Sequence, residues 1–157
     1  MRKIALGLFA SLMLLALALP CFAETQHECA IFGLVPNMTS KDVESKLGKA
    51  QIERKRDNSW HYRIKGSYKA MDDPVVYFND NNTVSWVMGS RLEKNGKLIL
   101  RSGDGDKKLE EALGKADTVT EDKANKATIY TYKKYALTVV TCQMQIRVFA
   151  IGRDDAK

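Results

Sequence analysis

The spacing of apolar residues predicts two short helices in this chain. In segment 39–47, and again in segment 105–113, two apolar side chains lie four residues apart, which places them on one face of a helix. Thr39 belongs to the residue types that cap helix N-termini, and a glycine follows each segment. The apolar pairs are Val43 with Leu47 and Leu109 with Leu113. Helices of about two turns are marginal alone, so both are expected to pack on a sheet.

Strand-like alternation follows each predicted helix. The predicted strands are 60–64, 75–78 and 84–88 after the first helix, and 129–132, 137–142 and 145–151 after the second. Between the two groups, Asn95-Gly96 is flanked by alternating residues. This dipeptide predicts a tight hairpin with 98–100 as its return strand.

A short sequence occurs twice, which indicates a duplicated unit. Leu47-Gly48-Lys49-Ala50 returns as Leu113-Gly114-Lys115-Ala116. The predicted fold class is therefore α+β. Two tandem repeats, each a helix followed by antiparallel strands, are expected at 24–92 and 93–157. Together they would form one continuous antiparallel sheet with both helices on one face.

The first 23 residues have the pattern of a secretory signal. Arg2 and Lys3 precede an uncharged, mostly apolar run at 4–19, and small residues lie before a polar segment. Cleavage is expected near Ala23, which makes the remaining chain an exported, soluble, periplasmic or secreted protein of 134 residues. The alternative is a retained membrane anchor, because the apolar run is close to the lower limit for a span.

The charge of the chain does not predict a nucleic-acid partner. Without Arg2 and Lys3, 23 basic and 19 acidic residues remain, for a net charge of +4. The basic residues are scattered, and their single run is Arg54-Lys55-Arg56. This pattern is typical of a solvated surface.

Two cysteines remain after removal of the predicted signal. Cys21 leaves with it, whereas Cys29 and Cys142 lie near the two ends of the remaining chain. In an oxidising compartment two such cysteines are expected to pair. A disulfide over so long a loop would stabilise the fold by roughly 4–5 kcal/mol at most.

The first predicted unit resembles a known family of small bacterial envelope proteins. The residues that carry the resemblance are Val35-Pro36-Asn37-Met38-Thr39, then Val43, Leu47-Gly48, and Trp60-x-Tyr62. They are similar to the SmpA/OmlA type of outer-membrane assembly lipoprotein, and the doubled form is similar to beta-lactamase inhibitory protein. The resemblance implies an exported, non-catalytic binding protein of the bacterial periplasm. The lipidation cysteine of the lipoproteins has no counterpart in this chain.

Catalytic chemistry is not expected from the residues present. His27 and His61 do not have the spacing of metal ligands, and a cysteine in a disulfide cannot act as a nucleophile. Asp104 and Asp106 look like the start of a calcium loop, but Lys108 stands where an oxygen ligand is needed. We therefore expect no enzyme, no metal and no cofactor. The alternative is an enzyme that uses His61 with a carboxylate.

Aromatic side chains on the predicted strands are the best candidates for binding. If helices cover one face of the sheet, alternate residues must point to the other face. Tyr62, Tyr77, Tyr130 and Tyr132 are the predicted binding residues, because tyrosine is enriched where protein interfaces concentrate their energy. The alternative for each ring is packing in the core.

These observations predict an exported periplasmic binding or adaptor protein. It would dock a protein, or a component of the cell envelope, on the open face of the sheet. The alternative function is a proteinaceous inhibitor of a secreted or periplasmic hydrolase.

Overall fold

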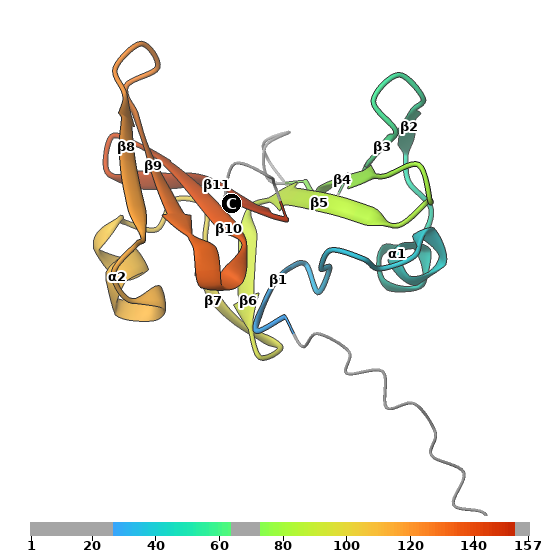
Figure 1. The fold of residues 1–157 in the computed structure, drawn as a ribbon, viewed down its shortest axis with the longest axis horizontal. Coiled ribbons are helices and arrows are strands. Elements are labelled where there is room, and N and C mark those ends of the chain that lie inside the picture. Colours follow the sequence, from blue (N-terminus) through green and yellow to red (C-terminus); the bar gives the residue numbers. More distant parts are fainter. Residues whose placement is uncertain (1–26, 64–72, 153–157) are drawn as a thin grey trace, which may run out of the picture.

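The chain is described by a computed structural model over residues 27–63 and 73–152. The predicted signal segment 1–23 lies outside the described residues, as does part of the predicted strand 60–64. Figure 1 shows a fold made mainly of antiparallel strands, with two short helices in the described part. The helices are α1 (Ser40–Leu47) and α2 (Lys107–Leu113), and a short 3-10 helix spans Lys133–Tyr135. The strands are β1 (Cys29–Ile31), β2 (Ile52–Arg54), β3 (Ser59–His61), β4 (Val75–Phe78), β5 (Val84–Gly89), β6 (Arg91–Lys94), β7 (Lys97–Arg101), β8 (Thr118–Asp122), β9 (Ala127–Tyr132), β10 (Leu137–Cys142) and β11 (Gln145–Ile151).

The strands form two separate antiparallel sheets. The larger sheet has eight strands in the order β2-β3-β4-β5-β11-β10-β9-β8, and the smaller has three in the order β1-β6-β7. Strands β5 and β11 join in the middle of the large sheet through three residue pairs, from Phe149 with Gly89 to Ile151 with Val87. The edge strands of the large sheet are β2 and β8.

The predicted fold class, two tandem helix-and-strand repeats in one continuous sheet, is wrong. The described residues form mainly antiparallel strands in two sheets. The hairpin expected around Asn95-Gly96 does form, as β6 and β7, but it leaves the large sheet and pairs with β1. Cys29 pairs with Lys94, and Ile31 pairs with Leu92. Three residues are too few to show an alternation, so the sequence pattern did not indicate β1 or the sheet that it completes.

The core lies between the large sheet and a layer made of both helices and the small sheet (Figure 1). Val43 of α1, Leu109 of α2 and Leu92 of β6 are all buried in one apolar cluster. On the large sheet, a row of directly paired residues crosses six strands and faces this cluster. The row is Trp60, Val76, Val87, Ile151, Leu137 and Tyr132.

The two helices begin differently and end alike. Thr39 starts α1 with a capping box, in which its hydroxyl accepts from the Asp42 backbone N–H and its own N–H donates to the Asp42 carboxylate. Asp106 precedes α2 without a side-chain cap. Gly48 and Gly114 end the helices with nearly the same angles, φ 78° and ψ −166° against φ 79° and ψ −168°. This region of backbone space is essentially restricted to glycine.

The small sheet approaches the large one at Gly89. A Cβ atom added there would lie 2.8 Å from the Ile31 Cγ2 and 3.0 Å from a Phe32 ring carbon. Glycine therefore lets the turn after β1 cross the middle of the large sheet. Among residues 27–63 and 73–152, no helix combines the length and apolar character that a membrane crossing requires.

Candidate functional site

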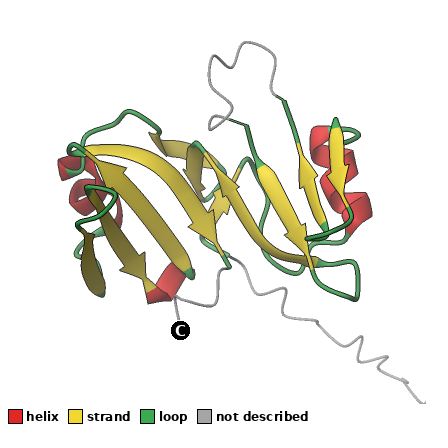
Figure 2. Cartoon of the chain, turned by 90° about the horizontal axis from the view of Figure 1, so that it is seen from above, coloured by secondary structure: helices red, strands yellow, loops and turns green. Residues whose placement is uncertain are grey.

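The face of the large sheet away from the helices is not covered by any described helix or strand (Figure 2). Strand alternation and the pairing register define which residues point to this open face. One row of paired residues crosses it from β3 to β8. The row is His61, Val75, Met88, Ala150, Thr138, Thr131 and Thr118.

Two aromatic rings stack on the open face. Tyr77 of β4 pairs directly with Trp86 of β5, their ring centroids are 3.8 Å apart, and the rings are within 5° of parallel. Both side chains are half-buried, so part of each ring faces outward. Nearby on the edge strand β2, Ile52 is 51% exposed. This end of the open face therefore presents apolar surface.

The four tyrosines predicted to bind do not lie together. Tyr77 is on the open face, whereas Tyr62 and Tyr132 are buried on the helix side at 5% and 3% exposure. Tyr130 is half-buried on the helix side as well. Burial raises the pKa of Tyr62 and of Tyr132 to about 12. Tyr62 and Tyr132 therefore pack in the core. A binding role for Tyr77 and Tyr130 stays a prediction.

His61 belongs to a short chain of polar groups on the β2–β3 hairpin. The Ser59 hydroxyl donates to the Asp57 carboxylate at 2.7 Å and lies 3.0 Å from the His61 Nε2. In a hydrolytic triad the acid contacts the histidine, whereas here it contacts the serine, and Ser59 is buried at 1% exposure. Burial, with the nearby Arg54 charge, lowers the pKa of His61. The group is a hydrogen-bonded turn, and it does not have the geometry of an activated nucleophile.

The two cysteines predicted to form a disulfide are free thiols in the structure. Cys29 is buried in β1 of the small sheet, and burial raises its pKa to about 11. Cys142 ends β10 in the large sheet and shares the open-face side of that strand with Thr138. The two residues belong to different sheets, and Cys142 points away from the side on which the small sheet lies, so the disulfide stays a prediction.

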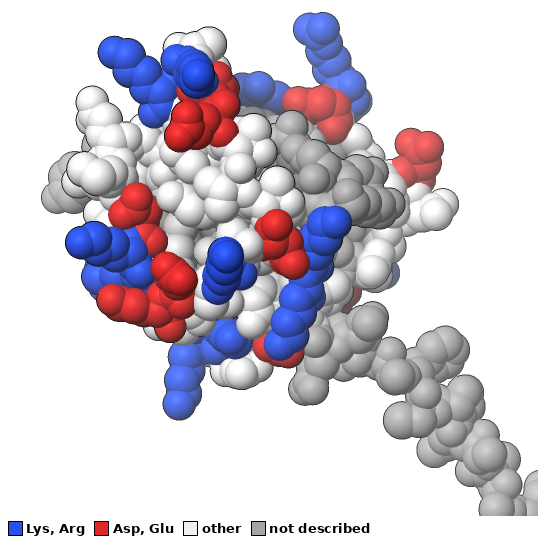
Figure 3. Space-filling view, turned by 60° about the vertical axis from the view of Figure 1, so that its left-hand side comes forward, with Lys and Arg blue, Asp and Glu red and all other residues white. Residues whose placement is uncertain are grey.

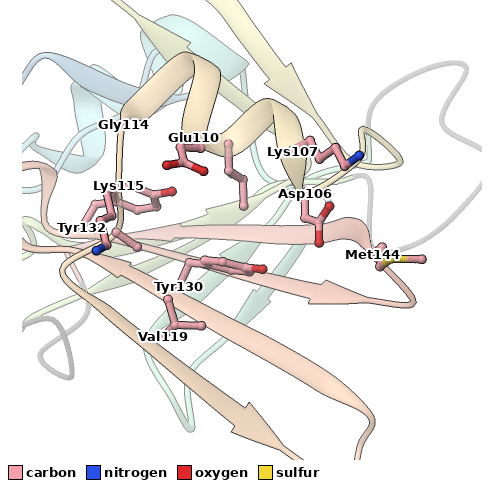
Figure 4. Close-up of a pocket in the computed structure, with 11 residues that line it drawn as sticks. Asp106, Lys107, Glu110, Gly114, Lys115, Val119, Tyr130, Tyr132 and Met144 are labelled. Atoms are coloured by element: carbon pink, nitrogen blue, oxygen red, sulfur yellow. The ribbon is translucent and has the colours of Figure 1, made fainter.

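Helix α2 covers a cavity that the sequence did not indicate. The cavity has a volume of about 420 Å³ and lies between α2, strands β8 and β9, and the turn from β10 to β11 (Figure 4). Leu109 and Tyr132 are its buried apolar residues, and Tyr130 lies half-buried between them and the opening. Val119 and Met144 also line it and are 55% and 74% exposed.

Met144 has an unusual backbone for its residue type. Gln143 and Met144 are the two central residues of the β10–β11 hairpin, with φ of 52° and 58°. A turn with two positive φ angles favours Asn and Gly, whereas a methionine there is strained. A sequence signal did exist, since an apolar residue occupies a turn position between two clear strands.

Acidic side chains of α2 face the cavity. Asp106 and Glu110 are four residues apart, and both line it. Figure 4 shows Asp106 directed toward the strands, whereas Lys107 points away. Burial raises the pKa of Tyr130, and the negative charge of Asp106 raises it further against an opposing hydrogen bond from Thr141. The Asp106 carboxylate therefore makes ionisation of the Tyr130 hydroxyl less favourable.

Charged residues elsewhere do not gather into a single-sign field in the view that brings the α2 side forward. Figure 3 shows basic and acidic side chains interspersed around an uncharged area. Within residues 27–63 and 73–152, no group of three or more histidine, cysteine or acidic side chains could hold a metal ion. The structure offers two candidate sites, the open face around Tyr77 and the α2 cavity.

Comparisons with known proteins leave the family of the chain undefined. No protein-family model and no curated protein matches it. Among solved structures, the chain is similar to YjgB, a DUF4309 family protein from Bacillus subtilis. The two chains are 14% identical, the likeness covers 71% of this chain and 76% of YjgB, and the TM-score is 0.49. This likeness does not define a function, and the resemblance to the SmpA/OmlA type stays a prediction.

Proposed function

We propose that the chain is an exported, non-catalytic binding protein that docks a protein partner on the open face of its large sheet. Export rests on the signal-like pattern of residues 1–23. The docking proposal rests on one observation, the stacked and half-exposed pair of Tyr77 and Trp86. A protein partner is favoured because large, rigid aromatic side chains concentrate binding energy at protein interfaces.

The stacked geometry suits a binding surface. Each ring is held by the other, so little side-chain entropy remains to be lost when a partner covers the pair. Ile52 extends the apolar surface toward the sheet edge, and His61 and Arg54 supply polar groups beside it. An apolar centre with polar neighbours is the usual composition of a protein interface.

Site-specific crosslinking tests this proposal. A photo-reactive phenylalanine analogue replaces Ile52 in one variant and Glu111, an exposed residue of α2, in the control. We expect a protein adduct in the bacterial envelope from position 52 and none from position 111. Equal adducts from both positions would contradict docking on the open face, and a lipid or glycan adduct would replace the protein partner with an envelope component.

The captured partner then allows a quantitative test with purified proteins. Tyr77→Ala should weaken binding by about tenfold or more, as truncation of a central aromatic residue does, and Tyr77→Phe should retain most of the affinity. Glu111→Ala is the matched control. Binding unchanged by Tyr77→Ala would overturn the proposal, and a hydrolase that loses activity in the complex would assign the inhibitor function.

A further inference from the structure

The α2 cavity has features of a ligand site that are independent of the open face. Its inner wall is apolar and fixed, because Leu109 and Tyr132 are buried at 1% and 3% exposure. Its outer wall consists of Val119 and Met144, whose apolar side chains remain largely exposed. A ligand that covered them would remove this apolar surface from water.

The aromatic part of the wall favours a cation. Tyr130 is half-buried and lines the cavity (Figure 4). The face of an aromatic ring carries negative electrostatic potential and attracts ammonium groups within about 6 Å of its centroid.

The acidic part of the wall points to the same ligand chemistry. Asp104 does not line the cavity and forms an ion pair with Lys108, in which the Lys108 Nζ lies 2.8 Å from the Asp104 Oδ1. Asp106 and Glu110 have no such partner in the described part of the chain, and Asp106 does not cap α2. Two carboxylates one helical turn apart are therefore available to a bound cation.

Two lysines also line the cavity, so its two carboxylates are balanced in formal charge. Lys107 and Lys115 both belong to its lining. Lys107 points away from the cavity in Figure 4, whereas Asp106 points toward the strands. The negative charge of Asp106 raises the pKa of the Tyr130 hydroxyl, after the larger effect of burial.

We propose that the α2 cavity binds an organic cation, an ammonium group carried on a compact apolar body. The apolar body contacts Leu109, Val119 and Met144, and the ammonium group lies between the Tyr130 ring and the Asp106 and Glu110 carboxylates. The cation is either a free amine or a lysine side chain flanked by apolar residues in a peptide, and both sources share the chemistry that the cavity recognises.

Titration of the full chain with matched probes tests this inference. Phenethylammonium is the free cation, 2-phenylethanol its neutral analogue, 3-phenylpropionate its anionic analogue, and an acetyl-Phe-Lys-Phe-amide peptide the chain-borne cation. Amide NMR shifts at Leu109, Val119, Tyr130 and Met144 report occupancy of the cavity. We expect a cation to bind about fivefold tighter than the neutral analogue, and the anion weakest. The cation that binds more tightly shows whether the ligand is a free amine or a lysine side chain in a peptide. If the neutral analogue binds as tightly as both cations, the proposal is overturned.

Five substitutions separate binding from folding. Asp106→Asn and Glu110→Gln should each weaken cation binding about threefold and leave the neutral analogue unchanged, whereas Glu111→Gln on the same helix should change neither. Met144→Asn removes an apolar side chain from the cavity wall, so it should weaken binding. Asparagine accepts the positive φ at this turn position, so the melting temperature should not fall. An equal loss in Glu111→Gln would contradict the site. Tyr77→Ala should leave cation binding intact, so failure of open-face docking and failure of this proposal are distinguishable.

Discussion

Helices α1 and α2 lie beneath opposite ends of the large sheet, and the space above each helix is filled differently. At the α1 end, Trp60 and Phe78 pack together with ring centroids 4.6 Å apart. At the α2 end, the strand second from the edge carries Tyr130, and its neighbour β10 carries Thr141. The cavity of about 420 Å³ lies at this end, and Tyr130 lines it.

This comparison sets two helices of similar form against strands that carry different side chains. The two helices have similar lengths, and both end at a glycine of the same conformation. The α1 end carries the Trp60–Phe78 contact, whereas the α2 end carries a candidate site. A cavity costs stability, because its lining atoms lose van der Waals partners.

The largest expected difference concerns the aromatic residue at each end. Trp60→Ala should lower the free energy of unfolding by about 3–5 kcal/mol, because it opens a cavity in a packed region. Tyr130→Ala should cost about 1–2 kcal/mol, because Tyr130 already lies beside empty space. Urea unfolding of both variants measures the difference. Equal losses would show that the two ends are packed equally well.

The glycines that end the helices should respond alike. Gly48→Ala and Gly114→Ala each force an alanine into a backbone region that is nearly restricted to glycine, so each should cost about 1–3 kcal/mol. No atom lies within 4 Å of the added Cβ at either position, so the cost reflects the backbone alone. A large difference between the variants in thermal unfolding would mean that one helix end rearranges.

The starts of the helices should differ by a smaller amount. Thr39→Ala removes the capping box of α1 and should cost about 1 kcal/mol. Asp106→Ala removes no cap from α2 and should change stability by less than about 0.5 kcal/mol. Denaturant unfolding of the two variants gives the comparison, and a loss in Asp106→Ala as large as in Thr39→Ala would contradict it.

Acid should reduce the difference at the helix starts. The hydrogen bonds from Thr39 hold the pKa of Asp42 below its usual range. A depressed folded-state pKa contributes stability above the pKa of the unfolded chain, and this contribution is lost as the pH falls through the folded value. The unmodified chain should therefore lose more stability below about pH 4 than Thr39→Ala does. Parallel pH dependence of the two proteins would contradict this role of Asp42.

The smallest expected effect concerns a hydroxyl at the α1 end. The Tyr62 hydroxyl is buried and has no hydrogen-bond partner among residues 27–63 and 73–152. Tyr62→Phe removes this unsatisfied group, so stability should stay unchanged or rise by up to about 1 kcal/mol. Thermal unfolding tests this, and a clear loss of stability would indicate that the hydroxyl does form a bond.

The local elements were predictable because their signals are local. The helix spacing, the caps and the closing glycines predicted α1 and α2 within two residues, and alternation predicted β4, β10 and β11 with their observed bounds. Strands β1, β2 and β8 were missed, since β1 and β2 have three residues each and β8 is an exposed edge strand. The division into two sheets depends on the long-range pairing of β1 with β6, which no local pattern records.

The candidate sites were predictable only in part. Alternation indicated that some aromatic residues would face away from the helices, and Tyr77 does. It could not indicate that Tyr62 and Tyr132 are buried beneath the helices, because the covered side of a strand follows from tertiary packing. The α2 cavity depends on which side-chain volumes meet across three elements, so it required the structure.

The seam between β5 and β11 has a mechanical consequence. Three residue pairs join the two halves of the eight-stranded sheet, whereas β9 and β10 share six. Strands β5 and β11 have six and seven residues, so much of each strand is not paired with the other, and bending of the sheet should concentrate at this line. Ile31 and Phe32 contact the sheet at this line, at Gly89, and should limit bending toward the small sheet. We therefore expect the molecule to adjust its width to a bound object by flexing at this hinge line while each half keeps its shape.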